Sequence, residues 1–86
     1  MKRFRIVTVN GRHLVAGGIL PARMIQVGQT WAPADGSNSA VEITKIQDGW
    51  VTYKSSTGTE HEKEIFPFQC RYCLVVPEPK LPPELR

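Results

Sequence analysis

The first apolar pattern of the chain alternates with a period of two residues on both sides of an Asn-Gly pair. Residues 4–9 are rich in β-branched side chains, and residues 12–16 resume the alternation after Asn10-Gly11. Asn-Gly favours the type I′ turn, because both of its central positions need positive φ. The pattern predicts a β-hairpin with a two-residue turn, in which Val9 faces Arg12 and each earlier residue pairs in step.

Both faces of this hairpin carry apolar side chains. One face holds Val7, Val9, Leu14 and Ala16, and the other holds Phe4, Ile6 and Val15. A strand that is apolar on both sides is usually covered on both sides. In a chain of 86 residues we expect one of these covers to come from a partner subunit.

A second alternating pattern predicts another hairpin in the middle of the chain. Residues 40–47 and 50–54 flank Asp48-Gly49, which is again a type I′ signal. The alternation slips between Ile43 and Ile46, and a β-bulge near Lys45 would keep both side chains on one face. Bulges of this kind bend short strands around a small barrel.

The remaining segments predict short elements and one mobile end. Shorter elements are expected as a helical turn at 22–26, strands at 30–32 and 72–76, a charged edge strand at 60–64 and a 3₁₀ turn at 68–71. Residues 77–86 contain four of the seven prolines, so an extended and mobile tail is expected there.

These segments together predict an all-β fold. We expect an N-terminal β-hairpin arm at 1–20, a small barrel at 21–76 and a disordered Pro-rich C-terminal tail at 77–86. No run of 18 apolar residues occurs, which argues against a transmembrane helix, and the basic start lacks the apolar stretch of a signal peptide. The chain is therefore expected in the cytoplasm, without membrane association.

Core and turn positions between residues 27 and 76 carry a resemblance. They are Val27-Gly28-Gln29-Thr30-Trp31, Gly49-Trp50-Val51-Thr52-Tyr53, Phe66-Pro67-Phe68 and Tyr72-Cys73-Leu74-Val75, with the alternating strand 41–46 between the first two. This pattern resembles small SH3-like β-barrel proteins encoded by phages and prophages, many of them of unknown function. The resemblance implies an SH3-like barrel and a phage-encoded protein acting in the host cell cytoplasm. It implies no chemistry by itself.

Charge is distributed unevenly along the chain. Residues 1–34 carry five basic residues and no acid, whereas residues 35–64 carry six acids against three lysines, and the net charge is +3. This asymmetry predicts a basic face at one end that meets an anionic partner.

Residue types with catalytic or metal-binding chemistry are few. The sequence contains no recognisable set of a nucleophile, a base and a group that orients the base, and it contains no phosphate-binding loop motif. An enzyme is therefore not expected. Cys70 and Cys73 form one Cys-x-x-Cys pair, which with His61 and His13 supplies the weak candidates for a metal site. The simpler interpretation is that Cys73 is a small buried apolar residue, with no cofactor and no metal bound.

A non-enzymatic binding function fits these observations best. We expect a modulator that binds a host protein through the basic hairpin face, with contacts from Arg3, Arg5, Arg12, His13, Arg23 and Trp50. Trp31 is expected in the core, and Trp50 and Tyr53 on opposite faces of one strand. The alternatives are a nucleic-acid-binding barrel, and a structural or homodimeric subunit that pairs through its hairpin.

Overall fold

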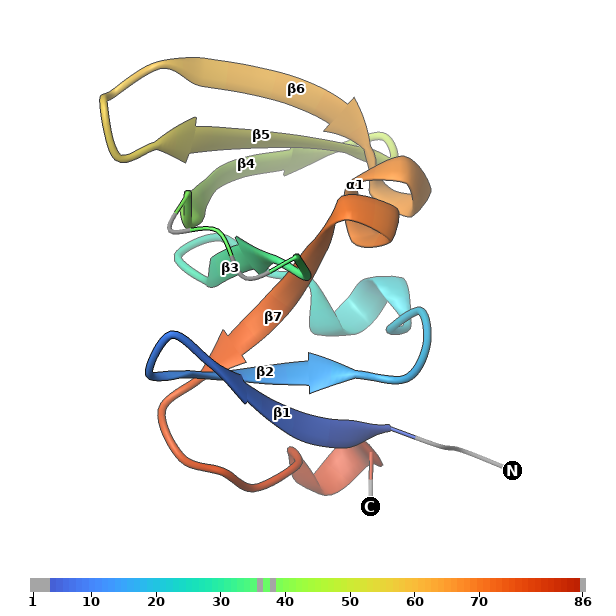
Figure 1. Ribbon diagram of the computed structural model, residues 1–86. Helices are drawn as coiled ribbons and strands as arrows, with labels where there is room; N and C mark the ends of the chain where they lie inside the picture. Colours follow the sequence, from blue (N-terminus) through green and yellow to red (C-terminus); the bar gives the residue numbers. More distant parts are fainter. Residues whose placement is uncertain (1–3, 36, 38, 86) are drawn as a thin grey trace.

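The chain folds into one curled antiparallel sheet that forms a half-barrel (Figure 1). The computed structural model describes residues 4–35, 37 and 39–85. The strand order is β1-β2-β7-β3-β4-β5-β6. The strands are β1 (Arg5–Val9), β2 (Arg12–Ala16), β3 (Thr30–Pro33), β4 (Val41–Gln47), β5 (Trp50–Ser55), β6 (Glu60–Glu64) and β7 (Tyr72–Val76). The helical segments are η1 (Ala22–Met24), α1 (Ile65–Arg71) and η2 (Pro83–Leu85).

The first two strands pair around the Asn-Gly turn. Asn10 and Gly11 have φ values of 52° and 77°, the left-handed conformation that a type I′ turn requires. Val9 lies opposite Arg12, and Val7 lies opposite Leu14. These are the partners that a two-residue turn gives, so the local sequence sets the register here.

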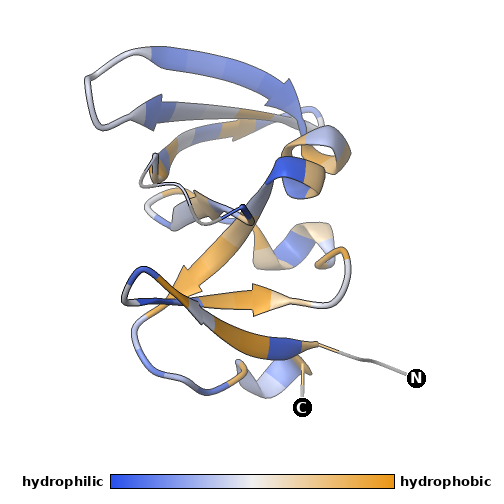
Figure 2. Cartoon of the chain, in the orientation of Figure 1, coloured by the Kyte–Doolittle hydropathy of each residue, from blue (hydrophilic) through white to orange (hydrophobic). Residues whose placement is uncertain are grey.

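The two strands lie within the sheet and do not project from it as the separate arm that we expected. β2 pairs with β7 as well as with β1, placing His13 opposite Val76 and Leu14 opposite Val75. β7 is one of the most apolar strands, as the orange colour in Figure 2 shows, whereas β6 is hydrophilic along its whole length. An apolar strand such as β7 gains stability from a neighbour on each edge, and β2 supplies one of them.

The second hairpin contains the expected bulge. Asp48 and Gly49 have φ values of 52° and 80°, and the register of β4 against β5 shifts between Ile43 and Lys45. The shift confirms the predicted irregularity, and it keeps both Ile43 and Ile46 packed in the core. β6 stands at the end of the strand order, so the prediction of a charged edge strand is also confirmed.

The segment between β6 and β7 is an α-helix, where only a 3₁₀ turn at 68–71 was expected. The helix α1 begins at Ile65 and continues through Pro67. Proline is tolerated there because the first-turn N–H groups of a helix have no partner within the helix. The helix buries Phe68 completely. The centroid of the Phe68 ring lies 5.2 Å from that of Trp31 and 5.0 Å from that of Tyr53.

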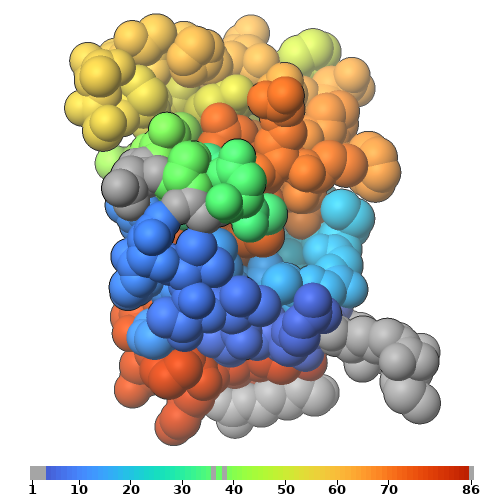
Figure 3. Space-filling view, viewed as in Figure 1, coloured from blue at the N-terminus to red at the C-terminus, as the bar shows by residue number. Residues whose placement is uncertain are grey.

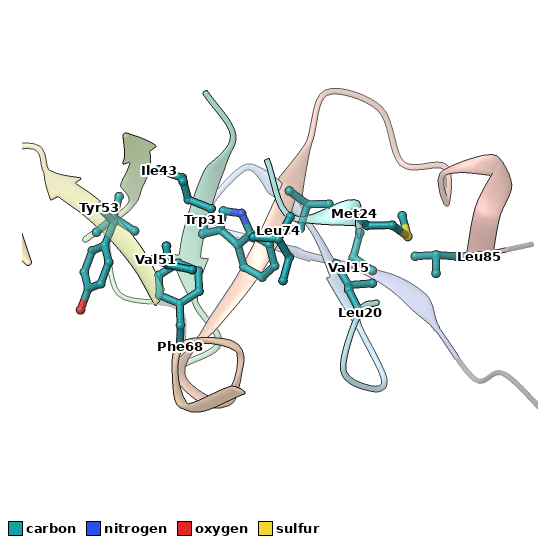
Figure 4. Packing of buried hydrophobic residues seen from close by; sticks show 12 residues of the cluster. Val15, Leu20, Met24, Trp31, Ile43, Val51, Tyr53, Phe68, Leu74 and Leu85 are labelled. Carbon is teal, nitrogen blue, oxygen red and sulfur yellow. The ribbon is translucent and has the colours of Figure 1, made fainter. Parts of the chain in front are cut away.

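Trp31 lies in the middle of the core, as predicted, with 1 % of its surface exposed (Figure 4). The amide of Gln29 holds the segment that leads into it. Its Oε1 accepts hydrogen bonds from the Trp31 Nε1–H at 3.1 Å and from the Gln26 N–H at 2.9 Å, and its Nε2 donates to the Met24 carbonyl at 2.8 Å. Because the indole N–H has a partner, the ring is buried without a desolvation penalty.

The Pro-rich tail is not the mobile end that its composition predicted. It turns back beneath the first two strands (Figure 1), and Leu85 keeps only 3 % of its surface exposed. Leu81 packs against the same core, together with Phe4 and Ile6 from the inner side of the hairpin. The two leucines supply apolar surface that stabilises the docked tail when it is buried. The prolines restrict the unfolded backbone, so less conformational entropy is lost when the segment becomes ordered. The chain itself therefore covers this face of the hairpin, for which a partner subunit had been considered.

Within the described part of the chain, no helix has both the length and the apolar character needed to cross a membrane.

The docking of the tail predicts a measurable loss of stability in Leu85→Ala. Removing a buried leucine side chain lowers the free energy of unfolding by about 2–5 kcal/mol, and equilibrium urea unfolding measures it. The control is Val27→Ala, which alters a side chain with 60 % of its surface exposed. A change below about 1 kcal/mol in Leu85→Ala would show that the tail contributes nothing to the core.

Candidate functional site

Two of the predicted contact residues share one face of the hairpin. Arg5 lies opposite Ala16, and Arg12 lies opposite Val9, so the two arginines stand at opposite ends of the same face. The side chains between them are apolar. We define the hairpin face as Arg5, Val7, Val9, Arg12, Leu14 and Ala16.

The centre of the hairpin face is closely packed and its ends are charged. Leu14 has 3 % of its surface exposed, Val7 and Val9 are half-buried, and Arg5 is exposed. None of the three apolar side chains belongs to the main core cluster, so they lie on the other side of the sheet, where Val7 and Val9 are partly accessible and Leu14 is covered. In Figure 3 the hairpin (blue) occupies the lower part of the visible face of the molecule.

The hairpin also presents a strand edge. β1 is the first strand in the sheet order, and β2 is its only neighbour among the described strands. In an antiparallel pair, alternate residues direct their N–H and C=O groups away from the partner strand. This edge can therefore accept hydrogen bonds from an added strand.

The other predicted contacts lie elsewhere. His13 is on the opposite face of β2, where its Nδ1 lies 3.0 Å from the hydroxyl of Thr8. Arg23 is exposed on η1. Arg3 lies outside the described residues.

Trp50 is exposed as expected but does not join the hairpin face. It retains 47 % of its surface, whereas Tyr53 retains 5 %, which confirms that the two rings lie on opposite faces of β5. Three strands, β7, β3 and β4, separate β5 from β2 in the sheet. Trp50 lies in an open hollow of about 350 Å³ whose walls carry one base, Lys45, and two acids, Asp48 and Glu62.

An apolar pocket adjoins the hairpin face. Its volume is about 300 Å³, and its walls come from the end of β2, the loop 17–20, Trp31, Ala34, Gln69 and β7. Ala16 belongs both to the hairpin face and to the pocket wall. Sequence reasoning missed this pocket because its walls are distant in the sequence, and the Gly17-Gly18 pair is the one local signal of it.

The side chain of Gln69 fixes one wall of this pocket. Its Oε1 accepts a hydrogen bond from the Leu20 N–H at 2.8 Å, and its Nε2 donates to the Leu20 carbonyl at 3.0 Å. This two-bond contact joins α1 to the loop that follows β2. Gly17, with a φ of 112°, makes the turn into that loop in a conformation that favours glycine.

The two cysteines are free and differ in environment. Cys70 is exposed, and Cys73 is half-buried in the pocket wall, where burial raises the pKa of its thiol. His61 packs against Tyr53, with 5.6 Å between the ring centroids and the planes tilted by 30°. Across residues 4–35, 37 and 39–85, no three side chains of His, Cys, Asp or Glu gather closely enough to hold a metal ion.

The described part of the site combines an apolar surface, two arginines, a strand edge and a small pocket. Comparison with protein-family models, with curated proteins and with solved structures gives no match to this chain. These surface features are those of protein interfaces, which have an apolar centre and a polar rim in which arginine is common.

The environment of Cys73 predicts a difference in thiol reactivity. A raised pKa leaves less thiolate at a given pH, and burial also restricts access of the reagent. At pH 8, Cys70→Ser, which retains only Cys73, should react with an aromatic disulfide reagent at least about tenfold more slowly than Cys73→Ser. Denaturant should abolish the difference, and equal rates in the folded protein would contradict the burial of Cys73.

The Gln69 contact predicts a pH-dependent loss of stability in Gln69→Glu. A carboxylate can accept from the Leu20 N–H but repels the Leu20 carbonyl, so the free energy of unfolding should fall by about 1–3 kcal/mol at pH 7. This repulsion raises the pKa of the new carboxyl group in the folded state. The penalty should therefore shrink as pH falls from 7 to 4, where the protonated group can donate to the carbonyl. The exposed Gln47→Glu is the control, and a pH-independent loss in Gln69→Glu would refute this account.

Proposed function

We propose that this chain is a non-enzymatic binding protein, built on a small SH3-like barrel, that captures another protein through its hairpin face. The observation that carries the proposal is the pair of half-buried valines, Val7 and Val9, between Arg5 and Arg12 on an edge of the sheet. Protein interfaces combine these same elements.

The chemistry of the hairpin face defines its partner. Arg5 and Arg12 favour a surface with carboxylates at matching positions, since guanidinium groups bind carboxylates in a bidentate manner. The edge of β1, beside which no other described strand lies, favours an extended segment that adds a strand, with main-chain hydrogen bonds for affinity and side chains for specificity. The partner is thus a protein with an acidic, extended segment.

The biological setting follows from the resemblance to small phage-encoded barrels. In that setting the chain modulates a host protein in the host cell cytoplasm. The positive charge of residues 1–34 supports the same assignment, because it steers an acidic partner toward the hairpin.

The positions of the aromatic and basic side chains favour a protein partner over a nucleic acid. Binding of a single strand by stacking needs exposed aromatic rings beside a basic groove. Trp50, the exposed ring on β5, is separated from Arg12 on β2 by three strands and from Arg5 on β1 by four. Its own surroundings include Asp48 and Glu62, which repel phosphate.

Charge reversal on the hairpin face tests the proposal. The double variant Arg5→Glu/Arg12→Glu should lose at least about tenfold in the amount of host protein retained from a bacterial lysate by the immobilised chain. The matched control is Arg23→Glu/Lys80→Glu, which changes the net charge equally at two exposed positions away from the hairpin face. Circular dichroism should show the same fold for both variants.

Three outcomes would contradict the proposal. Equal retention of host protein by the two double variants would show that the interface lies outside the hairpin face. Retention of oligonucleotides that weakens steeply with salt would favour nucleic-acid binding. A mass that rises with concentration in light scattering, and that the hairpin variant abolishes, would identify self-association as the role of this surface.

A further inference from the structure

The pocket beside the hairpin face is a preformed apolar recess. Core residues form its floor, since Trp31, Leu20 and Leu74 are each at least 94 % buried and all contribute to its wall. The Gln69 hydrogen bonds to Leu20 hold its rim in place. A recess with a rigid floor and rim binds without the cost of ordering a loop.

The size of the pocket restricts what it can hold. Sites for complete small molecules range from about 300 to 1,000 Å³, so a cavity of about 300 Å³ is at the lower limit of that range. One bulky side chain fits such a volume better than a drug-sized ligand or a cofactor. Among the described residues of its wall, the titratable groups are the thiol of Cys73 and the phenol of Tyr72, so the pocket favours an uncharged occupant.

Two arginines are direct neighbours of residues in the pocket wall. Arg5 lies opposite Ala16, which is part of the wall. Arg71 directly precedes Tyr72 in the wall, and its carbonyl accepts a hydrogen bond from the Ala34 N–H at 3.4 Å. Asp35, which follows Ala34 of the wall, adds one negative charge and accepts a hydrogen bond from the Ser37 N–H at 3.0 Å. These charged neighbours of the wall are therefore two arginines and one acid.

We propose that this pocket receives one aromatic side chain from the partner, carried on a segment whose flanking residues are acidic. The inference rests on the proposed function, because the acidic residues beside the anchor lie against Arg5 and along the hairpin face. The pocket adds an aromatic anchor to an acidic extended segment, and a buried aromatic anchor is the usual source of affinity in such an interface. Charge complementarity then sets the position of the segment around it.

A pair of synthetic peptides tests the anchor directly. One is a blocked peptide with a central tryptophan and acidic residues on both sides, and the other has alanine at the centre. Titrated into the isotope-labelled full chain and followed by NMR, the tryptophan peptide should shift the signals of Ala16, Gly17, Gly18 and Cys73. It should bind at least about tenfold more tightly than the alanine peptide, and its presence should slow alkylation of Cys73.

A pocket-filling variant provides the second arm of the test. Ala34→Phe places a ring in the wall of the pocket, outside the hairpin face, and should weaken binding of the tryptophan peptide about tenfold, while affinity for the alanine peptide stays the same. Ala22→Phe, at another exposed alanine outside this wall, is the matched control. Should Ala34→Phe fail to fold, protection of Cys73 in the unaltered chain decides the question.

The outcomes separate failure of the anchor from failure of the proposed function. Equal affinity for both peptides, with shifts confined to β1 and β2, would overturn the pocket and leave the hairpin face as the binding surface. Shifts confined to β5 around Trp50 would also overturn it. No binding of either peptide up to about 5 mM would refute the anchor, and the lysate experiment with the hairpin variants would then judge the proposed function independently.

Discussion

The architecture depends on the position of β7 between β2 of the N-terminal hairpin and β3 of the remaining sheet. β7 pairs with β2 through Val75 and Val76, and with β3 through Tyr72, Cys73 and Leu74. Among the described strands, it is the one that joins the N-terminal hairpin to the curled sheet around Trp31. The short helix before it inserts Phe68 against Trp31 and Tyr53, so the same segment closes the core and completes the sheet.

Features fixed by neighbouring residues could be predicted from the sequence, and features fixed by distant contacts could not. Asn10-Gly11 and Asp48-Gly49 adopt positive φ, and the slip in the alternation between Ile43 and Ile46 corresponds to a real bulge. The docking of Leu85 could not be predicted, because a proline-rich composition indicates the conformation of the backbone but not where the Leu81 and Leu85 side chains pack. The helix that begins at Ile65 was also not predicted. Pro67 indicates a break in regular structure, but proline is tolerated in the first turn of a helix.

The candidate site shows the same division. Strand register alone places Arg5 and Arg12 on one face, because the pairing of β1 with β2 is determined by its turn. The distance of Trp50 from that face depends on the order of all seven strands, which no local pattern encodes. The apolar pocket depends most on contacts between distant parts of the sequence. Its wall is formed by the loop after β2, Trp31, Gln69 and β7, which come together only in the folded chain.

The pairing of β2 with β7 has a consequence for the order of events during synthesis. His13 and Leu14 leave the ribosome long before Val75 and Val76, and until then the apolar sides of the early hairpin have no neighbour to cover them. Closing so long a loop slows folding, and the uncovered strands are exposed to aggregation in the interval. The hairpin can therefore form before β7 is synthesised but is enclosed only afterwards, which leaves its apolar side chains open to other proteins in the interval.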